Sequence, residues 1–338
     1  MGISKQGEQI VLQQLFTRLE EHLLGKQAMI HQFITVLLAG GHLLLEDIPG
    51  VGKTMLVHTF AEAIGGQFKR IQFTNDTMPT DVTGGLTLTG EGYALGFRPG
   101  PIMANIVLAD EINRAMSRTQ SALLEAMEER TVTVDGRTYA LPQPFMLIAT
   151  QNPLHMEGTN RLPEAQLDRF MAKLSIGYPA EEDEKRMLQK LVAGDQKYSF
   201  KDDGKNMSIT NIETWSAMQQ AVSQIYVEHS LLQRMVKVVH QTRHHKDTIL
   251  GVSPRGSRDW LKVAQANAYV AGRAYVIPED IVETATYVLP HRLQMHSGVS
   301  RSNASVTAAS TAPDKIAYIK QLLQEQFASV YWPKGNAR

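Results

Sequence analysis

Gly50-Val51-Gly52-Lys53-Thr54 is the stretch of this sequence that decides its fold. It follows the apolar run Leu43-Leu44-Leu45 and opens an amphipathic stretch that continues to Ile64, which predicts a strand, a glycine-rich turn and a helix. A turn of this kind suits phosphate, because backbone N–H groups converge on the oxygens, glycine permits close approach, and the helix N-terminus adds partial positive charge. We therefore expect Lys53 to reach the β- and γ-phosphates of a nucleotide and the Thr54 hydroxyl to ligate Mg²⁺.

The loop departs at one position from the general phosphate-loop pattern, G-x-x-x-x-G-K-[ST]. Asp47 stands where that pattern has its first glycine. The strand, the later glycines, the lysine and the helix signal are all present, so we keep the phosphate-loop interpretation. The alternative is a glycine-rich turn that caps an ordinary helix. The residues expected to contact nucleotide are Asp47, Pro49, Gly50, Val51, Gly52, Lys53, Thr54 and Met55.

Length and composition narrow the class of protein. The 338 residues allow about two domains, and 43% apolar against 20% charged residues favours a folded chain with a sizeable core. The 34 Lys and Arg residues balance 34 Asp and Glu, which argues against a dedicated nucleic-acid binder, whose affinity would come from basic residues. Because cysteine is absent, disulfides, thiolate metal sites and cysteine nucleophiles are excluded.

No stretch has the character of a targeting or membrane segment. Charged and polar residues interrupt the apolar ones from Met1 to Glu21, unlike the hydrophobic region of a signal peptide. No run reaches the roughly 18 consecutive apolar residues that a membrane-spanning helix needs. We therefore expect a cytoplasmic protein without a membrane span, which is compatible with a membrane-associated partner.

Short apolar runs alternate with amphipathic stretches over residues 1–180, as in an α/β fold. Since parallel strands need crossover helices, we predict a central parallel sheet flanked by helices on both faces. Asp135-Gly136, between alternating apolar residues, also predicts a β-hairpin. The predicted strands are Leu43 to Leu45, Ile71 to Phe73, Ile102 to Ala109, Phe145 to Ala149 and Ala172 to Ile176.

The pattern becomes helical after Pro179. A Ser- and Thr-rich stretch at about 297–311 is expected to be a linker before the last helix. The sequence thus indicates two domains, an αβα core over 1–179 and an all-α domain over 180–338. Helices in the second are predicted at 181–192, 212–225, 230–244, 254–272, 278–289 and 313–328.

Two acids end another apolar strand. Ile106-Val107-Leu108-Ala109 is followed by Asp110 and Glu111. A buried strand that delivers these acids to the carboxyl edge of the sheet places Asp110 where it can hold Mg²⁺ and Glu111 where it can polarise an attacking water. Acids at a strand end are also common as solvated caps, but their place on a second strand after the phosphate loop makes the pair more specific.

A third strand, Leu147-Ile148-Ala149, also ends in polar residues, Thr150-Gln151-Asn152. Asn152 at that edge would orient a water near the γ-phosphate through hydrogen bonds. Because Asn152 precedes Pro153, ordinary turn chemistry is the alternative.

Together these stretches resemble the AAA+ ATPases, and specifically the MoxR family. The resemblance implies an AAA+ P-loop NTPase core followed by a C-terminal all-α lid. It runs from about Gly25 to Ala328 and is carried by Gly41 to Asp47, Leu108 to Ala115, Thr119 to Met127, Ala149 to Pro153 and Leu162 to Phe170. In that family Lys53 and Thr54 match the Walker A residues, Asp110 and Glu111 the Walker B pair, and Asn152 the sensor 1 position.

The resemblance also gives a role to several arginines. Arg169 matches the arginine finger that reaches into a neighbouring subunit's nucleotide, and Arg255 matches the sensor 2 arginine of the lid. Such fingers accelerate phosphoryl transfer by ~10³ to 10⁵ in other nucleotide hydrolases. Asn160-Arg161 replaces the Tyr-Pro common in the family, so Arg161, like Arg114, is a further candidate for a contact in trans. Surface salt bridges are the alternative for Arg169 and Arg255.

Two segments resemble insertions of the family. Residues at about 80–101 resemble the helix 2 insert, and a hairpin at about 131–142 resembles the insertion before sensor 1. Exposed glycine-rich loops often carry function, so we expect both to contact a substrate or partner. Plain surface loops are the alternative.

The resemblance implies an enzyme that uses ATP and Mg²⁺ and hydrolyses ATP at the interfaces between its subunits. Such a protein would form a homo-oligomeric ring, expected to be a hexamer, that remodels, activates or matures a protein client. The family suggests a client with a von Willebrand factor type A domain, and the neutral net charge favours protein over nucleic acid.

Other functions remain open at this point. A nucleotide-gated assembly scaffold would act on its partner through ATP binding rather than turnover. The motor subunit of a metal chelatase shares the same insertions. A small-molecule kinase also uses a phosphate loop, but it has no need for Glu111, an arginine finger or a sensing lid.

Overall fold

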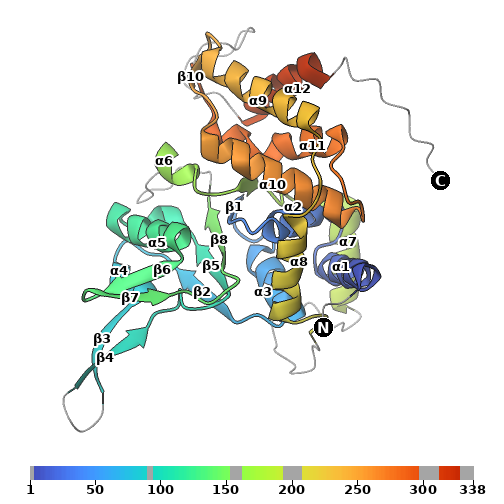
Figure 1. Cartoon of the computed structure of the whole chain (residues 1–338). Coiled ribbons are helices and arrows are strands. Elements are labelled where there is room, and N and C mark those ends of the chain that lie inside the picture. Colours follow the sequence, from blue (N-terminus) through green and yellow to red (C-terminus); the bar gives the residue numbers. More distant parts are fainter. Residues whose placement is uncertain (1–3, 90–93, 153–161, 193–207, 297–311, 328–338) are drawn as a thin grey trace. The chain divides into compact units, whose positions relative to one another are not determined.

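The computed structural model describes residues 4–89, 94–152, 162–192, 208–296 and 312–327 (Figure 1). The chain forms two compact units, Met1–Ala221 and Val222–Arg338. The predicted linker at 297–311 and Arg161 lie outside the described residues. Of the helices in the described part of the chain, none is both long and apolar enough to cross a bilayer.

A five-stranded sheet forms the centre of the first unit. Its strand order is β2-β5-β8-β1-β9, and all neighbouring strands are parallel. β5 and β8 are buried at nearly every position rather than at alternate ones, as expected for a sheet covered on both faces. The predicted parallel sheet is confirmed, with strands at Leu43–Glu46 (β1), Phe68–Gln72 (β2), Ile106–Asp110 (β5), Met146–Gln151 (β8) and Ala172–Leu174 (β9).

Two helices that the sequence reading missed precede the first strand. α1 (Lys5–His22) begins at Ser4, whose hydroxyl accepts the Gly7 N–H, and it buries a leucine stripe along one face. α2 (Gln27–Leu38) is apolar almost all round, which is typical of a helix buried on every side. The other helices are α3 (Lys53–Ala63), α4 (Pro79–Thr83), the short turn η1 (Ile112–Arg114), α5 (Ser117–Glu129), α6 (Glu164–Leu167), α7 (Glu181–Val192) and α8 (Ile212–Val222).

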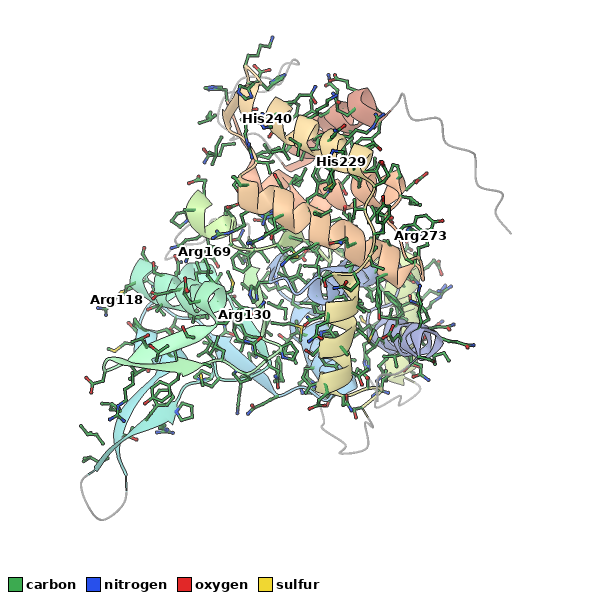
Figure 2. The ribbon with its side chains drawn as sticks, in the orientation of Figure 1. Arg118, Arg130, Arg169, His229, His240 and Arg273 are labelled. Carbon is green, nitrogen blue, oxygen red and sulfur yellow. The ribbon has the colours of Figure 1, made fainter. Side chains whose placement is uncertain are left out.

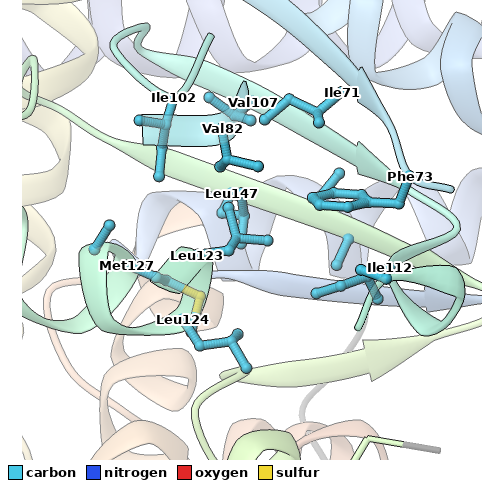
Figure 3. Close-up of a cluster of buried hydrophobic side chains, with 14 of the residues drawn as sticks. Ile71, Phe73, Val82, Ile102, Val107, Ile112, Leu123, Leu124, Met127 and Leu147 are labelled. Carbon is cyan, nitrogen blue, oxygen red and sulfur yellow. The ribbon is translucent and has the colours of Figure 1, made fainter. Parts of the chain in front are cut away.

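One hydrophobic cluster joins the sheet to α5 and α4 (Figure 3). Leu123 and Met127 of α5 are buried in this cluster with Val107 of β5 and Leu147 of β8. Their four-residue spacing places the two α5 residues on the same helical face. This packing holds β5 and β8 side by side, so the polar residues at the ends of both strands meet.

The apolar run from Ile102 to Ala109 was predicted as one strand, but β5 begins only at Ile106. The Ile102 N–H donates instead to the Val82 carbonyl at 3.2 Å, outside the sheet. Ile102 is nevertheless fully buried. Its apolar character therefore reflects the core and not strand pairing, a distinction that periodicity alone does not make.

Two antiparallel hairpins belong to this unit (Figure 1). β3 (Gly84–Thr89) pairs with β4 (Ala94–Pro99), and β6 (Thr131–Val134) pairs with β7 (Arg137–Ala140). The second hairpin turns at Asp135-Gly136, both with the positive φ that a type I′ turn requires. Phe97 and Tyr139 stack with ring centroids 4.0 Å apart, which links the two hairpins.

The second unit is helical, as predicted for the lid. Trp260 is fully buried at its centre and donates its indole N–H to the Ile281 carbonyl at 3.0 Å. A short antiparallel pair of strands, which the sequence reading missed, accompanies the helices. The elements are α9 (His229–His244), β10 (Thr248–Leu250), α10 (Pro254–Val270), α11 (Pro278–Val288), η3 (Pro290–Arg292), β11 (Gln294–Met295) and α12 (Ala312–Phe327).

The compact units divide at residues 221 and 222, later than the break expected at Pro179. α7 and most of α8 belong to the first unit. Trp215 of α8 is fully buried and meets Phe60 of α3 with ring centroids 5.1 Å apart, and the Thr210 N–H donates to the Ala63 carbonyl. The change in pattern at Pro179 therefore marks the end of the sheet and not the end of the unit, because α8 still packs on α3.

His42 is a buried histidine that directly precedes β1, a strand between β8 and β9. Its Nδ1 accepts the Leu147 N–H of β8 at 3.0 Å. Burial, with a smaller effect from the positive charge of Arg130, lowers the pKa of His42 to about 3. The unfolded chain binds a proton at this ring near pH ~6.5 and the folded chain does not. The stability that the neutral ring contributes is therefore full above this pH and is lost as the pH falls towards 3.

We expect the free energy of unfolding to fall by up to ~1.4 kcal/mol per pH unit below about pH 6.5 through His42 alone. Urea unfolding measured from about pH 7 to about pH 5 reports this slope. His42→Gln should show a shallower slope, whatever its absolute stability. His229→Gln, which replaces an exposed histidine, should keep the wild-type slope. Equal slopes for His42→Gln and the wild type would contradict the prediction.

Candidate nucleotide-binding site

Two glycines with left-handed backbone shape the loop between β1 and α3. Gly50 has φ 85° and Gly52 has φ 90°, a region that residues with a Cβ rarely adopt. Gly52 is also the N-cap of α3, so the loop runs directly into the first helical turn. The first N–H groups of a helix have no acceptor within it, which makes this end suited to an anion.

Lys53, the first residue of α3, is held on this loop. Its ammonium donates to the carbonyl oxygens of Asp47 at 2.8 Å and Ile48 at 3.0 Å. Burial lowers the pKa of Lys53, and the negative charges of Asp47, Asp110 and Glu111 oppose that shift. The Lys53 ammonium thus lies close enough to all three carboxylates to interact with their charges.

The structure gives Asp47 a different task from the one its sequence position suggested. Asp47 lines the same cavity as the loop, but its carboxylate accepts the hydroxyl of Ser175 at 2.8 Å and the backbone N–H groups of Ile176 and Gly177 at 2.5 and 3.0 Å. These donors follow β9. A carboxylate at the first position of the loop therefore braces the loop against the next segment of the sheet edge, which a glycine there would not do.

Asp110, the last residue of β5, is bonded through both carboxylate oxygens. Oδ1 accepts the Thr150 hydroxyl at 2.6 Å. Oδ2 accepts Nε and Nη2 of Arg70 at 3.1 and 2.5 Å. Thr150 comes from β8 and Arg70 from β2, the two neighbours of β5 in the sheet. The sheet order therefore decides which side chains hold this acid.

Glu111 follows β5 in the left-handed conformation, with φ 57° and ψ 47°. Its N–H donates to the Thr150 hydroxyl at 2.8 Å. Its Oε2 pairs with Nε of Arg114 at 2.7 Å and accepts Nε2 of Gln72 at 3.3 Å. The turn places the Glu111 side chain in the same cavity as the loop.

A cavity of about 670 Å³ joins these groups. This volume lies within the range of small-ligand sites. All the loop residues expected to contact nucleotide line it, together with Asp110, Glu111 and Asn152. The turn after α1, the segment after β9, and α7 form its other end, which we call the apolar end. Its apolar lining residues are Leu23, Leu24, Ile176, Tyr178 and Met187, and Lys26, Asp183 and Glu184 add charged groups there.

Several lining residues were missed by the sequence reading. Arg70, Gln72 and Thr150 line the polar end, but none of them belongs to a motif with the loop or the acids. Because side chains alternate along a strand, Arg70 and Gln72 lie on the same face of β2. That spacing is the only sequence signal that would have predicted that these two residues act at one site. The apolar end had no signal, because its residues come from three separate segments.

The donor set fits Mg²⁺. The Thr54 hydroxyl and the Asp110 carboxylate line one cavity, and oxygen donors of these types are the ligands that Mg²⁺ takes from proteins. The Asp110 side chain is 12% exposed, and that of Arg70, which contacts Oδ2, is 47% exposed. Arg70 and a metal ion would therefore meet at the same carboxylate.

The arginines expected to contribute to the site differ in where the structure places them. Arg169 follows α6 (Figure 2). It pairs through Nε with Glu128 of α5 at 3.0 Å. Neither Arg169 nor Arg114 is among the described residues that line the cavity. Arg161 lies outside the described residues. Arg255 belongs to the second unit, in the first turn of α10, which Ser253 caps.

Comparisons with known proteins agree with this geometry. Residues 42–172 match the ATPase family associated with various cellular activities (AAA), and residues 240–313 match the AAA lid domain. A candidate ATPase from Cytophaga hutchinsonii has a crystal structure that superposes with a TM-score of 0.82 at 29% identity, covering 97% of this chain and 96% of that one. The class is therefore an AAA+ ATPase core with a helical lid.

The relatives narrow the class further. The chain is 48% identical over 274 residues to the uncharacterized protein YeaC of Bacillus subtilis, covering 81% of this chain and 84% of the relative. It is 40% identical over 281 residues to chaperone MoxR1 of Mycobacterium tuberculosis, covering 80% and 72%. The chain belongs to the MoxR family of AAA+ ATPases.

Proposed function

We propose that this protein binds MgATP in the cavity and hydrolyses it to ADP and phosphate. The observation that carries the proposal is the meeting of three segments at one cavity: the loop between β1 and α3, the acids that end β5, and Asn152 after β8. Each segment carries a different part of phosphoryl-transfer chemistry. The apolar end of the same cavity would take the nucleoside.

In this proposal each polar group has one task. Lys53 and the N–H groups of the loop bind the β- and γ-phosphates. Thr54 and Asp110 hold Mg²⁺, which neutralises charge on the phosphate oxygens. Glu111 accepts a proton from the attacking water, and Asn152 orients that water. Asp47 keeps the loop in register with the segment after β9.

We further propose that the catalytic unit is completed by a neighbouring copy in a ring, which we expect to be a hexamer. Arg169 does not line the cavity of its own chain in the described structure, and its motif resembles the arginine finger of the family. A second copy would bring that guanidinium to the γ-phosphate. Arg255 of the lid would sense the γ-phosphate from the same chain, and Arg114 and Arg161 are the further candidates for the contact in trans.

For the partner we propose a protein client that is remodelled or matured, with von Willebrand factor type A domain proteins as the first candidates. One relative is named a chaperone, and this chain has no net charge to attract nucleic acid. Leu88 and Leu95 face each other across the β3–β4 hairpin with 65% and 64% of their surfaces exposed, which suits contact with a client. We propose a cytoplasmic location, where ATP and Mg²⁺ are available.

ATP hydrolysis by the purified chain tests this proposal. We expect Mg²⁺-dependent release of phosphate by the wild type and a loss of about 10²-fold or more in Lys53→Ala, because the loop then lacks its cation for the transferred group. Lys237→Ala, which removes an exposed lysine of α9, should keep the wild-type rate. Failure of the wild type to bind ATP in a fluorescent-nucleotide titration would overturn the proposal.

A further inference from the structure

β8 lies between β5 and β1 in the sheet. Its hydrogen-bonded ladder with β1 extends further along β8 than its ladder with β5. On the β1 side pairing continues through Glu46 and Gln151. On the β5 side the last pair is Ala109 with Ala149. Thr150 therefore lies one residue beyond the end of the β5 ladder, where the main chain of β5 turns away towards Glu111.

Beyond the end of the β5–β8 ladder, the side chain of Thr150 makes the hydrogen bonds between the two strands. Its hydroxyl donates to Asp110 Oδ1 at 2.6 Å and accepts the Glu111 N–H at 2.8 Å. Thr150 is 1% exposed. A hydroxyl has a single proton to give, so the carboxylate takes it and the lone pairs are left for the N–H. Both acids are thus joined to β8 through one buried atom.

The other partners of Asp110 and Glu111 are far more exposed to solvent than Thr150 is. Arg70 and Arg114, which pair with Asp110 and Glu111, are 47% and 44% exposed. Exposed ion pairs of this kind contribute little and exchange readily with solvent or with an arriving ion. The buried hydroxyl of Thr150 has no such competitor from bulk water. Asp110 and Glu111 can therefore keep their hydrogen bonds to Thr150 while the exposed arginines rearrange.

The left-handed turn at Glu111 gives this bond a specific consequence. A glutamate rarely adopts φ 57°, so surrounding bonds must hold the conformation. The Glu111 N–H lies inside that turn, and Thr150 is its acceptor. Without the hydroxyl, the turn that aims the Glu111 carboxylate would lose its buried support.

We propose that Thr150 is a positioning residue that sets the Asp110 carboxylate and the Glu111 turn together. The inference rests on the proposed function, in which these acids hold the metal and activate water. Thr150 is distinct from Asn152, which follows the end of β8 and is proposed to act on the water itself. The intervening Gln151 bonds to Glu46 instead.

Thr150→Val and Thr150→Ser form the matched pair that tests the proposal. Valine keeps the shape and removes the hydroxyl, whereas serine keeps the hydroxyl and removes the methyl group. We expect kcat of Thr150→Val to fall ~10- to 100-fold with KM for ATP changed less than about 3-fold, since a small misplacement of catalytic groups affects the chemical step. Thr150→Ser should stay within about 3-fold of the wild type on both constants.

Nucleotide binding gives a second readout that does not depend on turnover. Titration of a fluorescent ATP analogue with and without Mg²⁺ measures how much the metal strengthens binding. This Mg²⁺-dependent gain should shrink in Thr150→Val and persist in Thr150→Ser, because only the former frees Asp110 Oδ1. Thr59→Val, a buried threonine of α3 outside the cavity, controls for the loss of any buried hydroxyl.

The outcomes separate the inference from the function on which it rests. Unchanged kcat and unchanged Mg²⁺-dependent gain in Thr150→Val overturn the inference. Equal losses in Thr150→Val and Thr150→Ser also overturn it, because packing of the methyl group would then explain them. A wild type that binds nucleotide but does not hydrolyse it overturns the proposed function, and the binding comparison still decides the role of Thr150. If Thr150→Val does not fold, Thr150→Ala takes its place in both measurements.

Discussion

Replacement of Glu111 by Gln is expected to reduce ATP turnover by about 10²- to 10⁴-fold while ATP binding stays intact. Glutamine keeps the length and the acceptor oxygen that Arg114 contacts in the structure, so the turn after β5 should survive. What it removes is the basic carboxylate that would take a proton from water. Phosphate release measures turnover, and a fluorescent-nucleotide titration measures binding.

Glu129→Gln provides the control for this experiment. It makes the same chemical change at an exposed glutamate of α5 and should leave turnover unaltered. Turnover of Glu111→Gln at close to the wild-type rate would show that another group is the base. The variant is also expected to retain bound ATP, so recovery of the proteins bound to it would identify the client.

The same variant distinguishes a motor from a scaffold. If the partner is activated only when ATP is turned over, Glu111→Gln should bind the client and leave it inactive. If ATP binding alone acts on the partner, the variant should activate it as well as the wild type does. Co-purification with a large chelatase subunit would instead favour the motor of a metal chelatase.

Arg169→Ala is the second variant with a large expected effect, a loss of ~10³-fold or more in hydrolysis. In the structure Arg169 pairs with Glu128 at 3.0 Å, and it is not among the described residues that line the cavity of its own chain. Its loss should therefore leave ATP binding by the single chain unchanged. In the proposed ring, the positive charge of Arg169 would instead reach the transition state from the next subunit.

Mixed rings test the contact in trans. Lys53→Ala subunits have a defective loop and an intact Arg169, and Arg169→Ala subunits have the reverse. In a random equal mixture, about one interface in four combines an intact loop with an intact finger, so partial activity should return. No recovery in rings shown to contain both variants would exclude the role in trans.

Controls separate the finger from its partner and its rivals. Glu128→Gln removes the negative charge that pairs with Arg169 and should keep turnover, because the finger itself remains. Arg114→Ala and Arg161→Ala, mixed in the same way with Lys53→Ala, test the two other candidates. Recovery with one of these, and not with Arg169→Ala, would reassign the finger.

Local signals predicted much of the fold. The strand, glycine turn and helix around Lys53 follow from apolar periodicity and backbone requirements that lie within a few residues of one another. The same holds for the hairpin at Asp135-Gly136 and for the helices of the second unit. The compact unit that contains the sheet extends past the change of pattern at Pro179 to Ala221, because Trp215 packs on Phe60 through a contact between segments distant in the chain.

The sequence by itself determined which chemical groups lie next to one another: Lys53 and Thr54 after a glycine-rich turn, and a pair of acids, Asp110 and Glu111, at the end of an apolar strand. Only the tertiary structure decided how these groups are held. Thr150 and Arg70 meet Asp110 because β8 and β2 are the neighbours of β5, and strand order is not written in any local pattern. Asp47 likewise is only a departure from the phosphate-loop pattern in the sequence. In the folded chain the backbone after β9 donates hydrogen bonds to its carboxylate, which fixes the loop to that segment.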